Sequence, residues 1–83
     1  MPHKEVKKAI GELNGELKKI PKETGVLEGI LEQAQEGIER YTPEAVQDLL
    51  ETLKRESKEF EADHPRVAVL INQLTNALNS LGI

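Results

Sequence analysis

The feature of this sequence that most constrains its fold is an apolar spacing of four and then three residues, which recurs in four separate segments. The four sets are Val6, Ile10, Leu13, Leu17 and Ile20; Leu27, Leu31, Ala34, Ile38 and Tyr41; Val46, Leu50, Leu53, Ser57 and Phe60, in which Ser57 is polar; and Val67, Ile71, Leu74, Leu78 and Leu81. Because an α-helix turns by about 100° per residue, each set forms one stripe along a helix. Stripes of this kind pack at shallow crossing angles. The spacing predicts an all-α fold, a small bundle of four helices.

Residues that start or stop helices lie between the stripes. Pro21 does not fit inside a helix, so the first helix should end near Ile20. Thr24 can cap the second helix, and Thr42 is a stronger cap for the third because Pro43 follows it.

The last helix is bounded in the same way. Pro65 breaks the chain before it, and either Asp63 or His64 can serve as its cap. Gly82 is placed as a left-handed stop, with Ile83 folding back onto the last turn.

The third and fourth stripes repeat the first two at an offset of 40 residues, so that Val6 corresponds to Val46. Two antiparallel hairpins of equal length impose such a repeat, with or without an old duplication, and we expect two hairpins packed into a bundle. We expect residues 1–83 to form a single helical domain. Residues 1–41 should be its softer half because they hold Gly11, Gly15, Gly29 and Gly37 at helical positions. Residues 43–83 form the C-terminal hairpin.

The last helix differs from the others in its lack of charge. Residues 65–81 carry one charged side chain, Arg66, whereas the remainder of the chain is rich in Lys and Glu. The face opposite its stripe consists of Val69, Asn72, Gln73, Asn76, Asn79 and Ser80. Exposed helix faces ordinarily favour Lys and Glu, and interface cores exclude charge. This face is therefore predicted to contact a second copy of the chain, burial within one chain being the alternative.

Composition excludes several classes of function. The net charge of −4 argues against a nucleic-acid partner. Cysteine is absent, and no apolar run is long enough to span a bilayer, so that we expect no integral membrane contact. The N-terminal residues lack the apolar segment of a signal peptide, and a cytoplasmic location is expected. Residues 1–22 carry a net charge of +3, which leaves membrane-surface association as a weaker hypothesis.

The sequence offers few groups for chemistry. His64 has carboxylates nearby, but adjacent Asp and His side chains do not converge on a metal ion. The neighbours of Ser57, Glu56 and Lys58, point elsewhere on a helix, and we expect its hydroxyl to bond to the carbonyl of Leu53. No residue is therefore assigned to a catalytic, metal or cofactor-binding site, and the protein is expected not to be an enzyme.

The segment Phe60-Glu61-Ala62-Asp63-His64-Pro65, followed by a helix that closes with Leu81-Gly82-Ile83, resembles a bacterial family known as domain of unknown function 4404. The resemblance is most specific over residues 60–83. It implies a short, acidic, helical protein and carries no activity.

These observations favour a non-enzymatic assembly module, a homodimer joined through its last helix. One alternative is a regulator or inhibitor that binds a different protein through the same helix. Another is an enzyme whose site forms only between two chains and uses His64.

Overall fold

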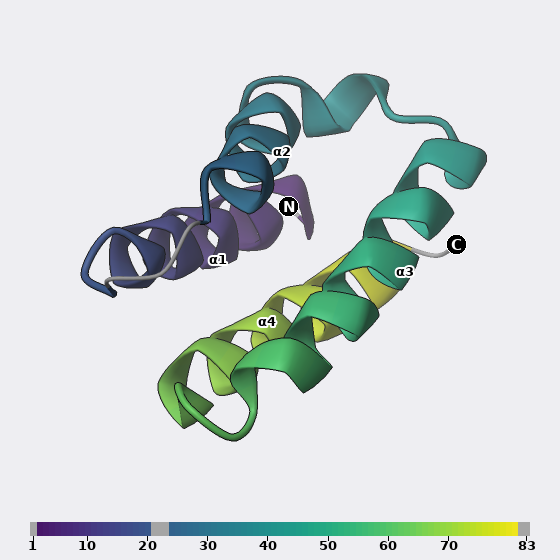
Figure 1. Cartoon of the computed structure of the whole chain (residues 1–83). Helices are drawn as coiled ribbons and strands as arrows, with labels where there is room; N and C mark the ends of the chain where they lie inside the picture. Colours follow the sequence, from purple (N-terminus) through teal and green to yellow (C-terminus); the bar gives the residue numbers. More distant parts are fainter. Residues whose placement is uncertain (1, 21–23, 82–83) are drawn as a thin grey trace.

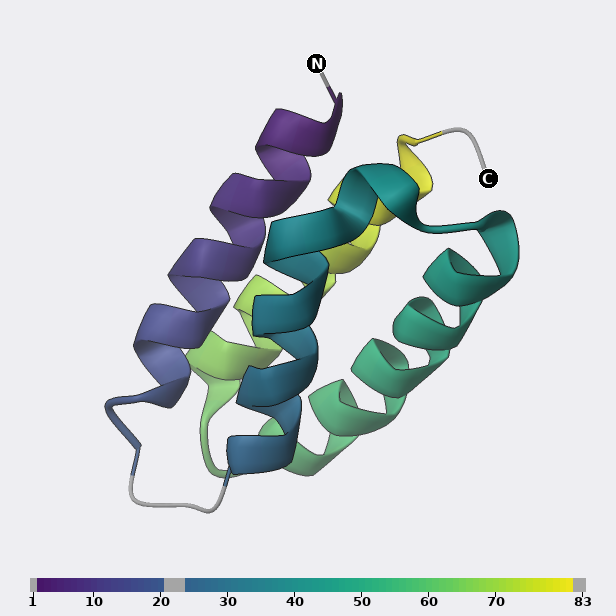
Figure 2. The same ribbon diagram turned by 90° about the horizontal axis from the view of Figure 1, so that it is seen from above.

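The computed structural model describes residues 2–20 and 24–81. These residues form four α-helices, α1 (Pro2–Leu17), α2 (Gly25–Gly37), α3 (Pro43–Phe60) and α4 (Pro65–Asn79), with a short 3-10 helix η1 (Ile38–Arg40) between α2 and α3. Consecutive helices run in opposite directions (Figures 1 and 2). The predicted all-α bundle of two antiparallel hairpins is therefore confirmed.

The four helices pack in a particular order. α2 packs against α1, α1 against α4, and α4 against α3. No Cα atom of α2 lies within 8 Å of a Cα atom of α3 in the described part of the chain, although the two helices follow one another in sequence. α2 and α3 are thus the outer helices in the packing order of an open bundle, and Figure 1 shows their ribbons apart.

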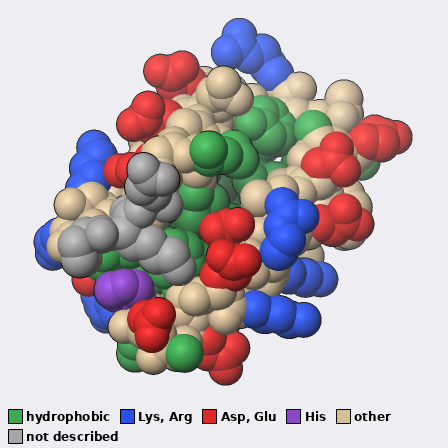
Figure 3. Space-filling model, viewed as in Figure 1, with side chains coloured by type: hydrophobic (Ala, Val, Ile, Leu, Met, Phe, Trp, Pro, Cys, Tyr) green, Lys and Arg blue, Asp and Glu red, His purple; other side chains and the backbone are tan. Residues whose placement is uncertain are grey.

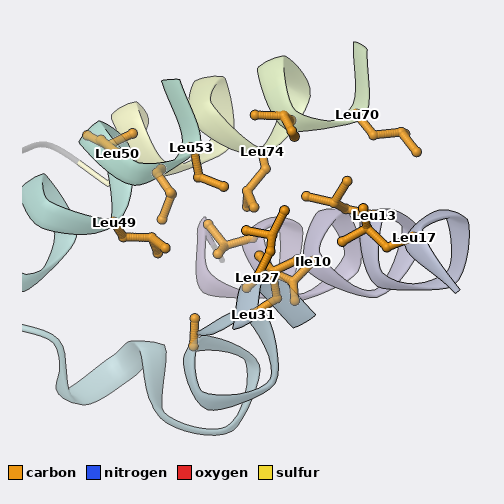
Figure 4. Close-up of a cluster of buried hydrophobic side chains, with 14 of the residues drawn as sticks. Ile10, Leu13, Leu17, Leu27, Leu31, Leu49, Leu50, Leu53, Leu70 and Leu74 are labelled. Carbon is orange, nitrogen blue, oxygen red and sulfur yellow. The ribbon is translucent and has the colours of Figure 1, made fainter. Parts of the chain in front are cut away.

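The apolar stripes meet in one aliphatic core. Figure 4 shows leucine side chains from all four helices pointing toward one another. The buried members are Val6, Ile10, Leu13, Leu17, Leu27, Leu31, Ala34, Ile38, Val46, Leu49, Leu50, Leu53, Phe60, Val67, Leu70, Ile71, Leu74 and Leu78. Ile20, Tyr41 and Leu81, at the ends of their stripes, are partly buried against this cluster. The spacing therefore identified most of the core correctly.

Two helices end earlier than their stripes predict. α1 ends at Leu17, and the amide of Ile20 donates a hydrogen bond to the Leu17 carbonyl in a tight turn. α2 ends at Gly37, and the chain tightens into η1, where the amide of Tyr41 donates to the Ile38 carbonyl at 3.1 Å. In both places the apolar residues still reach the core while the hydrogen bonding changes from α to 3-10 geometry. The predicted helix stop at Pro21 lies outside the described residues.

The predicted N-terminal caps have different outcomes. The Thr42 hydroxyl accepts a hydrogen bond from the Ala45 amide at 3.1 Å, which confirms it as the cap of α3. Thr24 occupies the N-cap position of α2, but its hydroxyl accepts no bond from a backbone amide of the helix, so the prediction of a side-chain cap is wrong. The hydroxyl donates to the Glu28 carboxylate at 2.9 Å.

Helix α4 was predicted to begin after a cap at Asp63 or His64 and to end at Gly82. His64 lies at the N-cap position and makes no side-chain cap bond, whereas its carbonyl accepts from the amides of Val67 and Ala68. The predicted stop at Gly82 and Ile83 lies outside the described residues.

Candidate functional site

Helix α4, whose one charged residue is Arg66, is an inner helix of the bundle, because it packs against both α1 and α3. Its buried residues are Val67, Ala68, Leu70, Ile71, Leu74 and Leu78. Two neighbours require a wider apolar face than one does, which explains why Ala68 and Leu70 lie beside the stripe and are buried. Burial within one chain thus accounts for the inward half of α4.

The outward half of α4 is the surface that the sequence analysis selected. All six residues, Val69, Asn72, Gln73, Asn76, Asn79 and Ser80, are exposed. They follow one another at intervals of one or three residues along one side of the helix, over about 16 Å at 1.5 Å per residue. We call these six residues the amide face.

The side chains of the amide face make few hydrogen bonds within one chain. The Ser80 hydroxyl donates to the Ala77 carbonyl at 2.6 Å. Within the described residues, the side-chain amides of the face make no hydrogen bond to protein. Val69 is 49% exposed, and it is one of two large apolar side chains in the described part that are exposed. Contacts within one chain therefore do not explain why charge is absent from this face.

The residues considered for catalysis do not gather into a site. His64 is half-buried beside Phe60, with 6.1 Å between the ring centroids and 58° between the ring planes. Ser57 is half-buried, and its hydroxyl makes no hydrogen bond within the described residues, so the predicted bond to the Leu53 carbonyl is wrong. Across residues 2–20 and 24–81, no three His, Asp or Glu side chains are grouped so that they could hold a metal ion.

A second surface was missed by the sequence analysis. Two hollows of about 570 and 260 Å³ lie between α2 and α3, and both are lined by Ile30 and Thr52. Together they make one groove along the open side of the bundle, which we call the α2–α3 groove. The signal was present in the sequence, because Val26 and Ile30 are apolar, four residues apart and outside the stripe of their helix. Leu49 in α3 likewise lies outside the stripe of its helix and lines the groove.

A comparison with protein-family models gives one match. Residues 6–83 match the model described as Domain of unknown function (DUF4404). The chain belongs to this family. The DUF4404 match spans both hairpins, so it includes the amide face and every residue that lines the α2–α3 groove.

The resemblance noted over residues 60–83 therefore extends through the earlier helices as well. The DUF4404 description names no activity, and neither the search of curated proteins nor that of solved structures found a match. Among the described residues, no helix is long and apolar enough to cross a membrane. The two surfaces are consequently the features from which a function can be argued.

Proposed function

We propose that this protein is a non-enzymatic helical assembly module, which forms a homodimer through the amide face of α4. The observation that carries the proposal is an exposed helix face without a single charge on a chain in which 31% of residues are charged. Asn and Ser are weaker helix formers than Lys and Glu, so helix stability does not favour their choice here. An interface core that excludes charge does favour it.

The chemistry of the face suits a contact between two copies. A twofold symmetric interface brings the same patch of both chains together, so the patch must complement itself. Each Asn or Gln amide has both donors and an acceptor, and one amide can therefore bond to an identical amide. Val69, near the start of the face, adds an apolar side chain that a second copy would cover. The proposal keeps the cytoplasm as the location, in line with the charged and cysteine-free composition.

The test is the solution mass of the protein with lysines placed on the face. Wild-type protein should show twice the 9.3 kDa of one chain in light scattering coupled to size-exclusion chromatography. The double variant Asn72→Lys with Asn76→Lys should shift towards monomer. The new charges must be desolvated in the interface, and they meet the same lysines of the second copy. The double variant Gln33→Lys with Gln47→Lys is the matched control, since both glutamines are exposed on other helices. It should remain a dimer.

The same measurement separates the proposal from its alternative. A dimer whose mass does not respond to lysine at positions 72 and 76 would exclude the amide face as the contact. A wild-type protein that stays monomeric at high concentration would exclude self-assembly. The regulator that uses the same face on a different protein would then be favoured.

A further inference from the structure

The α2–α3 groove joins the two hollows of about 570 and 260 Å³ that lie between the outer helices. Its wider end is lined by Thr24 to Leu27 and Ile30 of the α2 side, and by residues of the second half of α3 that end at Phe60. Its narrower end reaches Tyr41 and Ala45. Figure 3 shows hydrophobic side chains gathered between α2 and α3, with acidic and basic side chains around them.

The groove has an apolar base and an apolar edge. Leu27, Leu49 and Phe60 are buried members of the core that also line it. Ile30 is half-buried, and Val26 is 82% exposed at the edge. The core is therefore continuous with a surface that water reaches between the two outer helices, and an apolar occupant would extend that core.

The dimensions of the groove match a helix. It extends along α3 from Ala45 to Phe60, which is about 22 Å or four helical turns at 1.5 Å per residue. A groove between two helices accepts an amphipathic helix whose apolar residues recur at intervals of three and four. An added helix would lie against α2 and α3 as they lie against α1 and α4.

The charges of the lining indicate which kind of helix fits. The α3 side carries Asp48, Glu56 and Glu59 against one basic residue, Arg55. A second copy of the chain would present the same acidic groove and a net charge of −4, so like charges would meet. The outer face of α1 is basic, but its exposed residues include Lys8, Gly11 and Glu12 and supply no apolar anchors. A second copy is therefore a poor occupant.

We propose that the α2–α3 groove is a docking site for a basic amphipathic helix of another protein. Its apolar residues would pack on Ile30 and Val26, and its Lys or Arg residues would face Glu56 and Glu59. This site is separate from the amide face on α4, so that the proposed dimer and the docked helix do not depend on one another.

The test uses a designed 15-residue peptide of leucine and lysine, with the leucines on one helical face, and the same peptide with glutamate in place of lysine. Binding is followed by fluorescence anisotropy of the labelled peptides at near-physiological salt. The lysine peptide should bind one site per chain and become helical, whereas the glutamate peptide should bind at least tenfold more weakly. Equal binding of both peptides, or no binding of either, would overturn the proposal.

Matched variants locate the site. Val26→Asp should weaken binding of the lysine peptide at least tenfold even though it adds a negative charge, because it removes an apolar contact. Asp is tolerated in the first turn of a helix, and Val26 is exposed, so this variant should keep its fold. Val69→Asp makes the same change on the amide face and should bind as wild type does. Glu59→Lys should also weaken binding.

The remaining outcomes are equally decisive. If Val26→Asp binds the lysine peptide as well as or better than wild type, the attraction is only electrostatic and the groove is not the site. If Val26→Asp converts a dimer to a monomer while the double lysine variant of the amide face does not, the groove is an interface between copies and the docking proposal is wrong. Far-ultraviolet circular dichroism of each variant confirms that it is folded.

Discussion

Gln35 of α2 donates a hydrogen bond from its Nε2 to the backbone carbonyl of Lys7 in α1, at 3.0 Å. The bond crosses between the two helices of the first hairpin and passes close to Gly11, where an added Cβ would lie 3.3 Å from the same Nε2. Gly11 thus leaves room for the amide to reach a carbonyl on the neighbouring helix. Gly15 and Gly29 have no such neighbour among the described residues, because a Cβ there would meet nothing within 4 Å.

This difference predicts distinct effects of the three glycines on stability. Gly15→Ala and Gly29→Ala should each raise the free energy of unfolding by about 0.5–1 kcal/mol, since alanine is the better helix former and has free space. Gly11→Ala should raise the free energy of unfolding by less, and it should raise it by the full amount when Gln35→Ala is also present. Urea unfolding of the three glycine variants, of Gln35→Ala alone and of the double variant measures these values. Equal gains at all three glycines would show that the Gln35 bond does not depend on Gly11.

Acid should weaken the junction between α1 and η1. The Lys7 ammonium is paired with the Glu39 carboxylate, and this hydrogen-bonded pair lowers the pKa of Glu39 from its usual range. A lowered pKa in the folded state stabilises the fold above the unfolded pKa of about 4.3, and the stabilisation is lost as the pH falls through the folded value. Glu39 is exposed, so the effect should be small and sensitive to salt.

The measurement is the urea midpoint of wild type and Glu39→Gln at pH 7 and at pH 3. The variant should be less stable than wild type at pH 7, and the difference should disappear at pH 3. Glu36→Gln is the control, because Glu36 is exposed on α2 without an ion pair in the described residues. If the urea midpoint of Glu39→Gln is still below that of wild type at pH 3, the carboxylate does not act through its charge.

Asn14 is the polar residue of α1 that the fold buries. It is 7% exposed, and its Oδ1 has no hydrogen-bond partner within the described residues. A buried acceptor without a partner costs about 1–3 kcal/mol, so Asn14→Leu should raise the free energy of unfolding, by about 1 kcal/mol. Asn14→Asp should lower it because it buries a charge. Chemical unfolding monitored by circular dichroism tests both variants, and a destabilised Asn14→Leu would show that the amide makes contacts that favour the fold.

The stripes allowed the core to be predicted because helical periodicity is a local property of the sequence. Val6, Leu53 and Leu74 are each fully buried, as their positions in the stripes required. The cap at Thr42 was predictable for a similar reason, since Pro43 favours the start of a helix at that position. Thr24 shows the limit of local signals, because its hydroxyl donates to Glu28 one turn later and caps no backbone amide of the helix.

The α2–α3 groove could not be predicted from periodicity. A stripe shows which face of a helix is apolar, but it does not give the distance to the next helix. The tight η1 turn and the extended backbone at Tyr41 separate α2 from α3, and these features depend on hydrogen bonds that the apolar pattern does not encode. The off-stripe residues Val26 and Ile30 were the part of the groove visible in the sequence.

The two halves of α4 should respond differently to truncation. Leu70 is 3% exposed in the hydrophobic core, whereas the adjacent Val69 is 49% exposed on the amide face. Leu70→Ala should lower the free energy of unfolding by about 2–5 kcal/mol, a large part of the total expected for 83 residues. Val69→Ala should cost less than about 1 kcal/mol in the isolated chain. In a dimer joined through the amide face, its cost should increase with protein concentration, because assembly adds to stability by mass action.

Thermal and urea unfolding at several protein concentrations distinguishes these effects. The loss in free energy of unfolding caused by Leu70→Ala should be independent of protein concentration, since the side chain is buried within one chain. The deficit of Val69→Ala should grow only where wild type is dimeric, and Ala62→Ser, which alters an exposed residue outside α4, should show no such dependence. A concentration-independent cost at Val69 in a dimeric wild type would place the contact between the two chains elsewhere than on the amide face. A small cost at Leu70 would contradict the inner position of α4, because a helix packed on two neighbours cannot lose a buried leucine without leaving a cavity.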